Sequence, residues 1–328
     1  MIKLVIAVKS PVPLWNPPPW FAPDLQARFP HVQVVKLDGY RDLDRQIVDA
    51  EILVSWSLKV SQLLAAKQLR WIHSTAAGVA QLLFPEMLAS PVTLTNASAV
   101  MAEPVAEHTV AMILALAKRI PSAVRYQQQA LWGQAHIFAE QPPPMELAGA
   151  TLGLVGLGAI SRELVKRIRP MGMRVVAVKR DTTQGYEWAD RVLGPDRLRD
   201  LLAESDFVIL AAPEAPSTRG LIGAAELAAM KKTAYLINIA RGSLIDEGAL
   251  VEALQQGRIA GAGLDVTSVE PLPPESPLWS APNLLITHHL AACTERLWRR
   301  QFEVLAGNLE RYLGGQPLRN VVDKQAGY

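Results

Sequence analysis

Cysteine and long apolar runs are almost absent from this sequence, and each absence excludes a class of protein. The single cysteine, Cys293, allows no internal disulfide framework and no thiolate cluster for a metal. The apolar run at residues 4–8 is too short for the core of a signal peptide. The longest apolar helix candidate, Val105–Ala117, is too short to span a bilayer. We therefore expect a cytoplasmic protein with no metal site and no membrane partner.

An excess of charge of one sign is missing as well. The 33 Lys and Arg residues nearly balance the 31 Asp and Glu residues, and no basic run offers a nucleic-acid-binding face. Half of the 328 residues are hydrophobic, which is typical of a globular protein with a sizeable core. The length suits two domains of ordinary size, and we expect no nucleic-acid partner.

What is present is a strand–helix–strand pattern over Thr151–Asp181. The apolar runs Thr151–Val155 and Val175–Val178 are typical of buried parallel strands, and the stretch Ala159–Arg169 between them is helical until a proline ends it. The length and order of these segments predict the first unit of a dinucleotide-binding domain.

Two glycines follow the first of these strands. Gly156 allows a tight turn, and Gly158 lets a pyrophosphate approach the backbone, while Ala159 and Ile160 begin a helix whose free N–H groups face that negative charge. Ser161 takes the place of a third glycine and is small enough for close helix–sheet packing. Glycines also simply end strands, but inside a unit of this length we predict a cofactor site.

The end of the second strand bears on the choice of cofactor. An acid there would bind a ribose 2′-OH and favour NAD, whereas this sequence has Lys179 and Arg180. Two cations suit a 2′-phosphate, so we predict NADP (as NADPH), with NAD less favoured. The alternative is a solvated basic turn in which Asp181 takes over the role of the acid.

Residues 1–95 form an earlier series of alternating strands and helices, which indicates a parallel sheet with helices on both faces. The expected strands are Ile2–Val8, Val32–Val35, Ile52–Ser55, Trp71–His73 and Val92–Thr95. The expected helical segments are Asp24–Arg28, Arg41–Asp49 and Ser61–Lys67. The small residues Ser74–Val79 follow a strand and offer backbone N–H groups, although spacing alone favours an ordinary turn.

The chain is expected to cross between two domains twice. A strong helical pattern runs from Ala99 to Arg119, and the last helix, Thr294–Leu313, most plausibly returns to the first domain. This predicts a substrate domain of residues 1–97 plus 293–328 and a dinucleotide-binding domain of residues 98–292.

Two further features of the second domain are polar. Glu107 and His108 are candidates for catalysis, but we interpret them as the polar end of a buried helix. The polar segment Gln127–Gln141, with Trp132 inside it, is expected to form an arm at a subunit contact, so we expect a homodimer.

The strand pattern continues after the first unit of the second domain. The apolar runs are Phe207–Ala211, Ala234–Ile237, Gly261–Leu264 and Leu284–Thr287, with helical segments at Ala224–Met230 and Glu247–Gln255. In a doubly wound sheet ligands bind outside the carboxyl ends of the strands. The residues at those ends are Pro213, Asn238, Arg241, Asp265, His288 and His289.

Arg241, Glu270 and His289 have complementary chemistry at these strand ends. A guanidinium binds a 2-oxo acid carboxylate in a bidentate fashion. A histidine delivers a proton to the carbonyl oxygen while a nicotinamide delivers hydride. A carboxylate beside a histidine orients the ring and raises the pKa of the imidazole. Each residue alone has a duller explanation, such as an ion pair or a cap, but their spacing favours a shared site.

With these residues in place, the sequence resembles the D-2-hydroxyacid dehydrogenase family, and most closely its glyoxylate/hydroxypyruvate reductase branch. The resemblance covers nearly the whole chain. Its motifs are Gly153–Ser161, Ser217–Ile222, Asn238–Asp246, Gly261–Pro273, Leu285–Ala292 and Asn320–Asp323.

The resemblance implies an α/β fold of two doubly wound parallel-sheet domains, a flavodoxin-like substrate domain and a Rossmann domain. It places the catalytic arginine, glutamate and histidine at Arg241, Glu270 and His289, and the substrate carboxylate on Arg241 and on backbone groups of Ala77 and Gly78. It also places Asp265 against the nicotinamide carboxamide. The expected cofactor-binding residues are Gly156, Gly158, Ala159, Ile160, Lys179, Arg180, Pro213, Ile239, Ala240 and Asp265.

Four residues depart from the family pattern. The usual proline before the histidine is His288, the usual pair of glycines after it is Ala291-Ala292, and a phenylalanine expected after Val266 is Thr267. Two adjacent histidines therefore compete for the acid/base role. We choose His289 because an apolar residue and two small ones follow it.

The expected function is NADPH-preferring reduction of small 2-oxo acids to D-2-hydroxy acids, of the glyoxylate or hydroxypyruvate type. One alternative is a reductase for a branched or larger 2-oxo acid. Another is a nucleotide-sensing binding protein like the corepressors that share this fold, which retain the same three catalytic residues. The absence of long disordered tails and of a basic run favours the enzyme.

Overall fold

The computed structural model describes residues 1–182 and 186–327. The chain divides into two compact units, which we call the first unit (Met1–Met101 with Cys293–Tyr328) and the second unit (Ala102–Ala292). The first crossing falls after residue 101, whereas the sequence placed it after residue 97. Ala99 has a left-handed backbone (φ 70°), which a helix does not accommodate, and the long helix begins at Ala102 rather than at Ala99.

The first unit is built on a five-stranded sheet in which every pair of neighbouring strands is parallel. Its order, β2-β1-β3-β4-β5, is the flavodoxin-like order, as predicted. The strands are β1 (Ile2–Ile6), β2 (Val32–Lys36), β3 (Ile52–Val54), β4 (Trp71–His73) and β5 (Thr93–Thr95). The helices are α1 (Phe21–Arg28), α2 (Leu43–Gln46), α3 (Val60–Ala65), α4 (Pro85–Ala89) and α12 (Leu297–Leu313).

Both faces of this sheet are covered by apolar clusters. Residues of α1 and α12 pack in one cluster, and residues of α2, α3 and α4 pack in the other. The inner strands β1, β3 and β4 are almost wholly buried, and their residues are mostly apolar without alternation, the pattern of a parallel sheet covered on both sides. The edge strand β2 is more exposed and carries a glutamine and a lysine.

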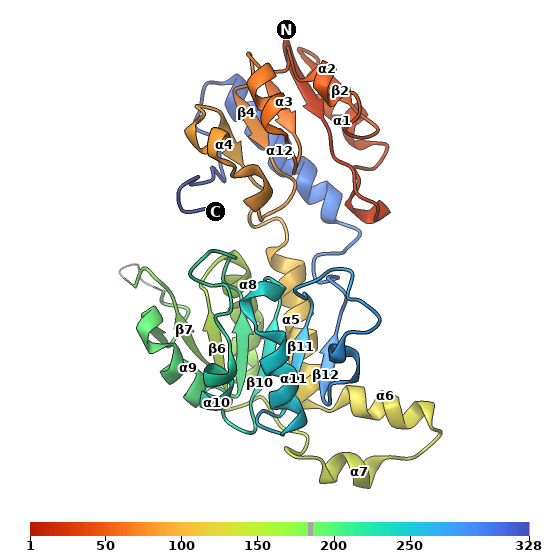
Figure 1. The fold of residues 1–328 in the computed structure, drawn as a ribbon, viewed down its shortest axis with the longest axis vertical. Coiled ribbons are helices and arrows are strands. Elements are labelled where there is room, and N and C mark those ends of the chain that lie inside the picture. Colours follow the sequence, from red (N-terminus) through yellow and green to blue (C-terminus); the bar gives the residue numbers. More distant parts are fainter. Residues whose placement is uncertain (183–185, 328) are drawn as a thin grey trace. The chain divides into compact units, whose positions relative to one another are not determined.

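The second unit has a seven-stranded parallel sheet of order β12-β11-β10-β9-β6-β7-β8 (Figure 1). The strand order reverses between β6 and β9, which is the switch point where a Rossmann sheet binds its ligand. The strands are β6 (Thr151–Val155), β7 (Arg174–Val178), β8 (Arg191–Leu193), β9 (Phe207–Leu210), β10 (Tyr235–Asn238), β11 (Gly261–Leu264) and β12 (Leu284–Ile286).

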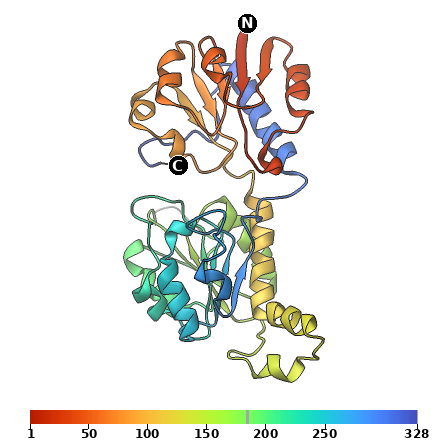
Figure 2. The same ribbon diagram turned by 45° about the vertical axis from the view of Figure 1, so that its right-hand side comes forward.

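Helices cover both faces of this sheet as well. The helices α5 and α8 pack against each other and on one face, and α9, α10 and α11 bury their apolar residues on the other. In Figures 1 and 2 the helices α6 and α7 project from the rest of the second unit as an arm. The helices are α5 (Ala102–Ala117), α6 (Ile120–Gln128), α7 (Gln134–Ala139), α8 (Ala159–Ile168), α9 (Leu198–Glu204), α10 (Ala224–Ala229) and α11 (Glu247–Gln255).

Short 3₁₀ helices complete the described chain. They are Pro13–Trp15, Ala80–Leu82, Arg169–Met171, Pro195–Arg197, Gly242–Leu244 and Pro277–Ser280. Over the described residues, no helix has both the length and the apolar character that crossing a membrane requires.

Candidate active site

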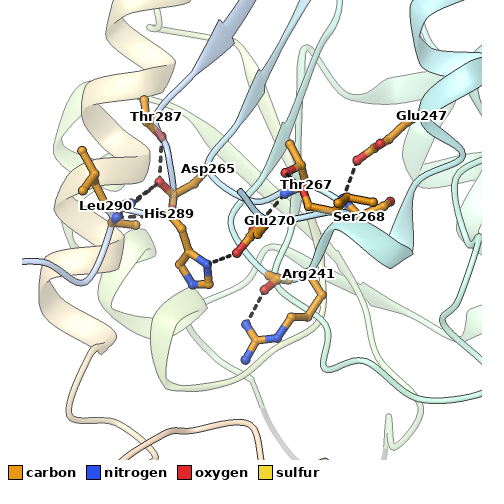
Figure 3. Close-up of polar contacts among 12 residues, drawn as sticks. Arg241, Glu247, Asp265, Thr267, Ser268, Glu270, Thr287, His289 and Leu290 are labelled. Atoms are coloured by element: carbon orange, nitrogen blue, oxygen red, sulfur yellow. Dashed lines mark hydrogen bonds and ion pairs between the residues drawn. The ribbon is translucent and has the colours of Figure 1, made fainter. Parts of the chain in front are cut away.

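Three neighbouring strands of the second unit, β10, β11 and β12, end at the same edge of the sheet. Arg241 follows β10, Glu270 follows β11 and His289 follows β12. Figure 3 shows the Glu270 and His289 side chains pointing toward each other, with Arg241 beside Glu270. The structure thus brings together the three residues that the sequence singled out.

The core of the site is a charge-assisted pair. The Nδ1 atom of His289 lies 2.7 Å from Oε2 of Glu270, and the backbone N–H of Thr267 donates to Oε1 of the same carboxylate at 3.0 Å. Because an ionised carboxylate only accepts hydrogen bonds, the proton between the two side chains belongs to His289 Nδ1. The glutamate therefore fixes the orientation of the ring.

The environment keeps Glu270 ionised. Partial burial acts to raise its pKa, but the hydrogen bonds from His289 and Thr267 and the positive charges of His289 and Arg241 act the other way. The net result is a pKa of Glu270 below its ordinary value. The carboxylate is therefore available as a hydrogen-bond acceptor over the whole neutral range.

The turn that carries Arg241 is held by a buried amide. The side chain of Asn238, which is fully buried, donates from Nδ2 to the carbonyl oxygen of Arg241 at 2.8 Å and accepts from the N–H of Ala240 at 3.0 Å. Ile239 and Ala240, both expected at the cofactor, are themselves buried in this turn. One guanidinium nitrogen of Arg241 donates to the carbonyl oxygen of Ala240 at 2.6 Å.

Gly242 lets the arginine turn touch the glutamate turn. A Cβ atom at this position would lie closer than 3.0 Å to backbone atoms of both Thr267 and Ser268. On the other side, the N–H of Ser268 donates to Oε1 of Glu247 at 2.6 Å. The sequence did not single out Glu247, and its one signal is an acid in the first turn of α11.

Asp265 lies beneath the turn that carries His289. Its side chain is almost fully buried, and Oδ1 accepts hydrogen bonds from the N–H of Leu290 at 2.9 Å and from the hydroxyl of Thr287 at 2.7 Å. The N–H of Ala291 donates to both carboxylate oxygens. The structure therefore assigns Asp265 the task of holding this turn, and its contact with a carboxamide stays a prediction.

The two adjacent histidines have different surroundings. His289 faces Glu270, whereas the His288 ring is exposed and its centroid lies 5.8 Å from that of Trp279. Both residues have a left-handed backbone, with φ of 54° at His288 and 57° at His289. Proline is locked near −65°, so a proline at position 288 would not fit this loop conformation.

Glu107 and His108, the two polar residues of α5 that the sequence analysis considered for catalysis, make different contacts. Glu107 accepts from Arg167 of α8 at 3.0 Å, as suits a surface ion pair. His108, however, places Nε2 2.8 Å from the hydroxyl oxygen of Thr287. His108 thus belongs to the hydrogen-bond network of the site, which its position in the sequence did not reveal.

The glycine turn of the second unit fits a dinucleotide pyrophosphate. Gly156 has φ of 101°, and a Cβ there would collide with the backbone at residues 211 and 212. Gly158 has open space where a side chain would be, and it precedes α8 with no side chain capping the first turn. The free N–H groups of that turn can therefore meet a phosphate. Ser161 is buried and donates to the carbonyl oxygen of Gly156, which ties the helix to the turn.

The end of β7 places a cation beside this turn. Lys179 Nζ donates to the carbonyl oxygen of Leu157 at 3.3 Å and lies 4.5 Å from the ring centroid of Tyr186. Arg180 is exposed, and Pro213, at the end of β9, is exposed as well. The sequence analysis did not single out Tyr186, because no pattern links it to Lys179.

Ala77 and Gly78 lie in the first unit, in the turn after β4. Asn96 Nδ2 donates to the carbonyl oxygen of Ala77 at 2.8 Å, and the N–H of Ala76 donates to the hydroxyl oxygen of Ser74 at 3.2 Å. These bonds fix the path of the turn on both sides of Ala77. Their role toward a carboxylate stays a prediction.

A Rossmann sheet, a glycine turn fit for a pyrophosphate and a histidine–glutamate–arginine set at the strand ends define a nicotinamide-dependent oxidoreductase. The comparisons with known proteins agree. The model of the family "D-isomer specific 2-hydroxyacid dehydrogenase, NAD binding domain" matches residues 110–291. A glyoxylate reductase of Korarchaeum cryptofilum is 34% identical over 266 residues, which is 80% of this chain and 78% of that protein.

Solved structures of this family resemble the chain over its full length. An NADPH-dependent glyoxylate/hydroxypyruvate reductase of Sinorhizobium meliloti, in complex with NADP and sulfate, superposes with a TM-score of 0.84 at 25% identity over 100% of both chains. A D-isomer specific 2-hydroxyacid dehydrogenase of Xanthobacter autotrophicus Py2, in complex with NADPH and MES, gives 0.83 at 29% identity over 99% of both chains. The chain therefore belongs to the D-isomer specific 2-hydroxyacid dehydrogenase family, and it is an NAD(P)-dependent enzyme that reduces 2-oxo acids.

Proposed function

We propose that this enzyme reduces small 2-oxo acids of the glyoxylate or hydroxypyruvate class to D-2-hydroxy acids and prefers NADPH. The observation that carries the proposal is the 2.7 Å contact between His289 and Glu270, beside Arg241, at the carboxyl ends of three adjacent strands. The names of the relatives support the substrate class, since glyoxylate reductases occur among them.

His289 is the proposed proton donor. Glu270 holds the proton on Nδ1, so the opposite ring nitrogen is the one that can face a substrate. A bound nicotinamide supplies the hydride. As hydride reaches the carbonyl carbon, the imidazolium gives its proton to the carbonyl oxygen, which completes the hydroxyl group.

Arg241 is the proposed carboxylate ligand. Its guanidinium commits one N–H to its own chain, and a planar fork of donors matches a carboxylate better than an ammonium does. Arg241→Lys should therefore be impaired although the charge is kept, chiefly through a higher KM for the 2-oxo acid. We keep Ala77 and Gly78 as further proposed substrate residues.

NADPH preference is proposed from the end of β7. Lys179 is held at the glycine turn by the Leu157 carbonyl and by the Tyr186 ring, and Arg180 follows it. A cation fixed there complements a 2′-phosphate, whereas an acid would repel it. Relatives solved with NADPH or NADP support this choice.

The deciding experiment is a substrate panel with the purified chain. Glyoxylate, hydroxypyruvate, pyruvate and a branched 2-oxo acid are each offered with NADPH and with NADH. The highest kcat/KM with a two- or three-carbon substrate and NADPH is expected. A branched acid in first place would replace the substrate class, and binding of NADPH without turnover of any 2-oxo acid would favour a nucleotide-sensing protein.

We also propose a homodimer formed through the arm. The side chains of Trp132 and Phe138 on the arm are 87% and 73% exposed, which is costly for a free surface. The base of the arm is firmly held, because the buried guanidinium of Arg119 donates to the carbonyl oxygen of Pro142 and lies 3.4 Å from the Glu140 carboxylate.

Light scattering tests the arm directly. Changing Trp132 and Phe138 together to serine should yield monomers. Leu64→Ser is the matched control, since this side chain is also exposed but lies in the first unit, and it should leave the mass unchanged. A wild-type monomer would end the proposal.

A further inference from the structure

His108 stands at the start of a hydrogen-bond chain that ends at the turn of the acid/base histidine. Its Nε2 atom lies 2.8 Å from Thr287 Oγ1, and the Thr287 hydroxyl donates to Asp265 Oδ1 at 2.7 Å. A hydroxyl group has one hydrogen, and here it is given to the carboxylate. The oxygen of Thr287 must therefore accept from His108, which places a proton on Nε2.

The chain continues from Asp265 into the backbone of the turn. The Asp265 carboxylate accepts hydrogen bonds from the N–H groups of Leu290 and Ala291. The backbone carbonyl oxygen of Asp265 accepts a third one from the N–H of His289 at 2.6 Å. One buried residue thus holds three successive backbone groups. Thr287 and His108 in turn fix the rotamer of that residue.

The turn needs such support because its backbone is strained. His288 and His289 are consecutive residues without glycine's freedom, and both lie in the left-handed region. Such residues persist only where the surroundings hold them. If the carboxylate of Asp265 rotated, the turn would be free to relax and His289 would leave Glu270.

We propose that His108 is a positioning residue for the reaction. Acting through Thr287 and Asp265, it keeps the His289 side chain in hydrogen-bond contact with Glu270. The direct distance from His108 Nε2 to Asp265 Oδ1 is 3.6 Å, too long for a hydrogen bond, so the threonine hydroxyl is the required bridge. This inference rests on the proposed role of His289. It adds a residue from α5 to a site otherwise built from strand ends.

The test is a set of variants at the two ends of the bridge. His108→Leu removes the donor, and Thr287→Val removes the hydroxyl while keeping its shape. Each should lower kcat on the order of 10- to 100-fold, as expected for a small misplacement of a catalytic group. NADPH affinity, measured by fluorescence without turnover, should change by less than about threefold.

Three readouts separate positioning from general damage. His108→Gln keeps an N–H donor and should recover most of the lost kcat. The double variant of His108→Leu with Thr287→Val should be no slower than either single one, because both break the same chain. Thr109→Val is the matched control, since its buried hydroxyl donates only to the helix carbonyl of Val105, and it should leave kcat unchanged.

The pH profile supplies the final discrimination. In His108→Leu the dependence of kcat on pH should keep its wild-type shape at a lower plateau. Loss of the wild-type pH dependence would make His108 the acid/base itself and overturn the inference, as would a kcat near that of wild type or additive losses in the double variant. If His108→Leu did not fold, Thr287→Val alone would decide. Inactivity of the wild type toward every 2-oxo acid would instead refute the proposed function.

Discussion

Gly242 joins the turn of Arg241 to the turn of Glu270, and its replacement by alanine should damage the site without removing any functional group. The added Cβ would meet the backbone of Thr267 and Ser268, which cannot rotate away as a side chain can. One of the two segments must move by about 1 Å, and a misplacement of that size costs on the order of 10²-fold in rate.

The loss follows from what these two residues hold. The N–H of Thr267 supports the Glu270 carboxylate at 3.0 Å, and the N–H of Ser268 is bound to Glu247 at 2.6 Å. A shift of either disturbs the 2.7 Å contact with His289. A 10²-fold loss of kcat/KM corresponds to about 2.7 kcal/mol of transition-state stabilisation, and overpacking should lower the free energy of unfolding by about 1–3 kcal/mol.

The assay follows NADPH oxidation with the best 2-oxo acid, and circular dichroism follows thermal unfolding. Gly307→Ala is the matched control. This glycine lies in the middle of α12 with open space around its Cα, so alanine there should stabilise the first unit by about 0.5–1 kcal/mol and leave the kinetics unchanged. A kcat/KM of Gly242→Ala within about threefold of wild type would refute the reasoning.

The remaining predictions concern the cofactor, the proton donor and acid stability. Wild type should prefer NADPH over NADH on the order of 30-fold in kcat/KM, because partly exposed contacts to the 2′-phosphate contribute about 2 kcal/mol. The double variant Lys179→Asp with Arg180→Ser should invert this preference through the KM for the cofactor. Equal use of both cofactors by wild type would contradict the prediction. His289→Ala should lose roughly 10²–10⁴-fold in kcat and His288→Ala far less, and the reverse order of effects would move the acid/base role to His288. Burial lowers the pKa of His73 to about 4, below its ordinary 6.5. As pH falls, the imidazole of His73 is protonated in the unfolded chain before it is protonated in the folded protein. The free energy of unfolding should therefore fall by about 3 kcal/mol as pH drops from 6.5 to 4 and change little above 6.5. Chemical denaturation of His73→Asn should show a weaker dependence of this free energy on pH, and an unaltered dependence would show that other groups cause it.

The central strands and the order of the catalytic residues followed from the sequence because both depend on local pattern. A buried parallel strand such as β6 is apolar throughout, and strand ends meet at one edge, so Arg241, Glu270 and His289 could be placed together. The elements that the sequence did not predict are short or exposed. The edge strand β8 has three residues, one of them an exposed arginine, and α9 has only two fully buried leucines.

The finer geometry of the site depends on loop backbones, which residue patterns do not encode. The sequence predicts a helix at Arg41–Asp49, whereas the structure has only the short helix Leu43–Gln46, because the polar residues there are compatible with both turn and helix. In the same way, the left-handed conformation of His288 and the burial of Asp265 beneath its turn arise from contacts between segments distant in the chain. These contacts became visible only in three dimensions.

The left-handed backbone at residue 288 also limits which side chains this position can accept. The loop holds φ at 54°, a value that no proline ring reaches, so His288→Pro would force the loop to change its path. The backbone shape, rather than the chemistry of the imidazole, therefore sets the tolerance of this position, and glycine or asparagine would fit it with less strain than a branched residue.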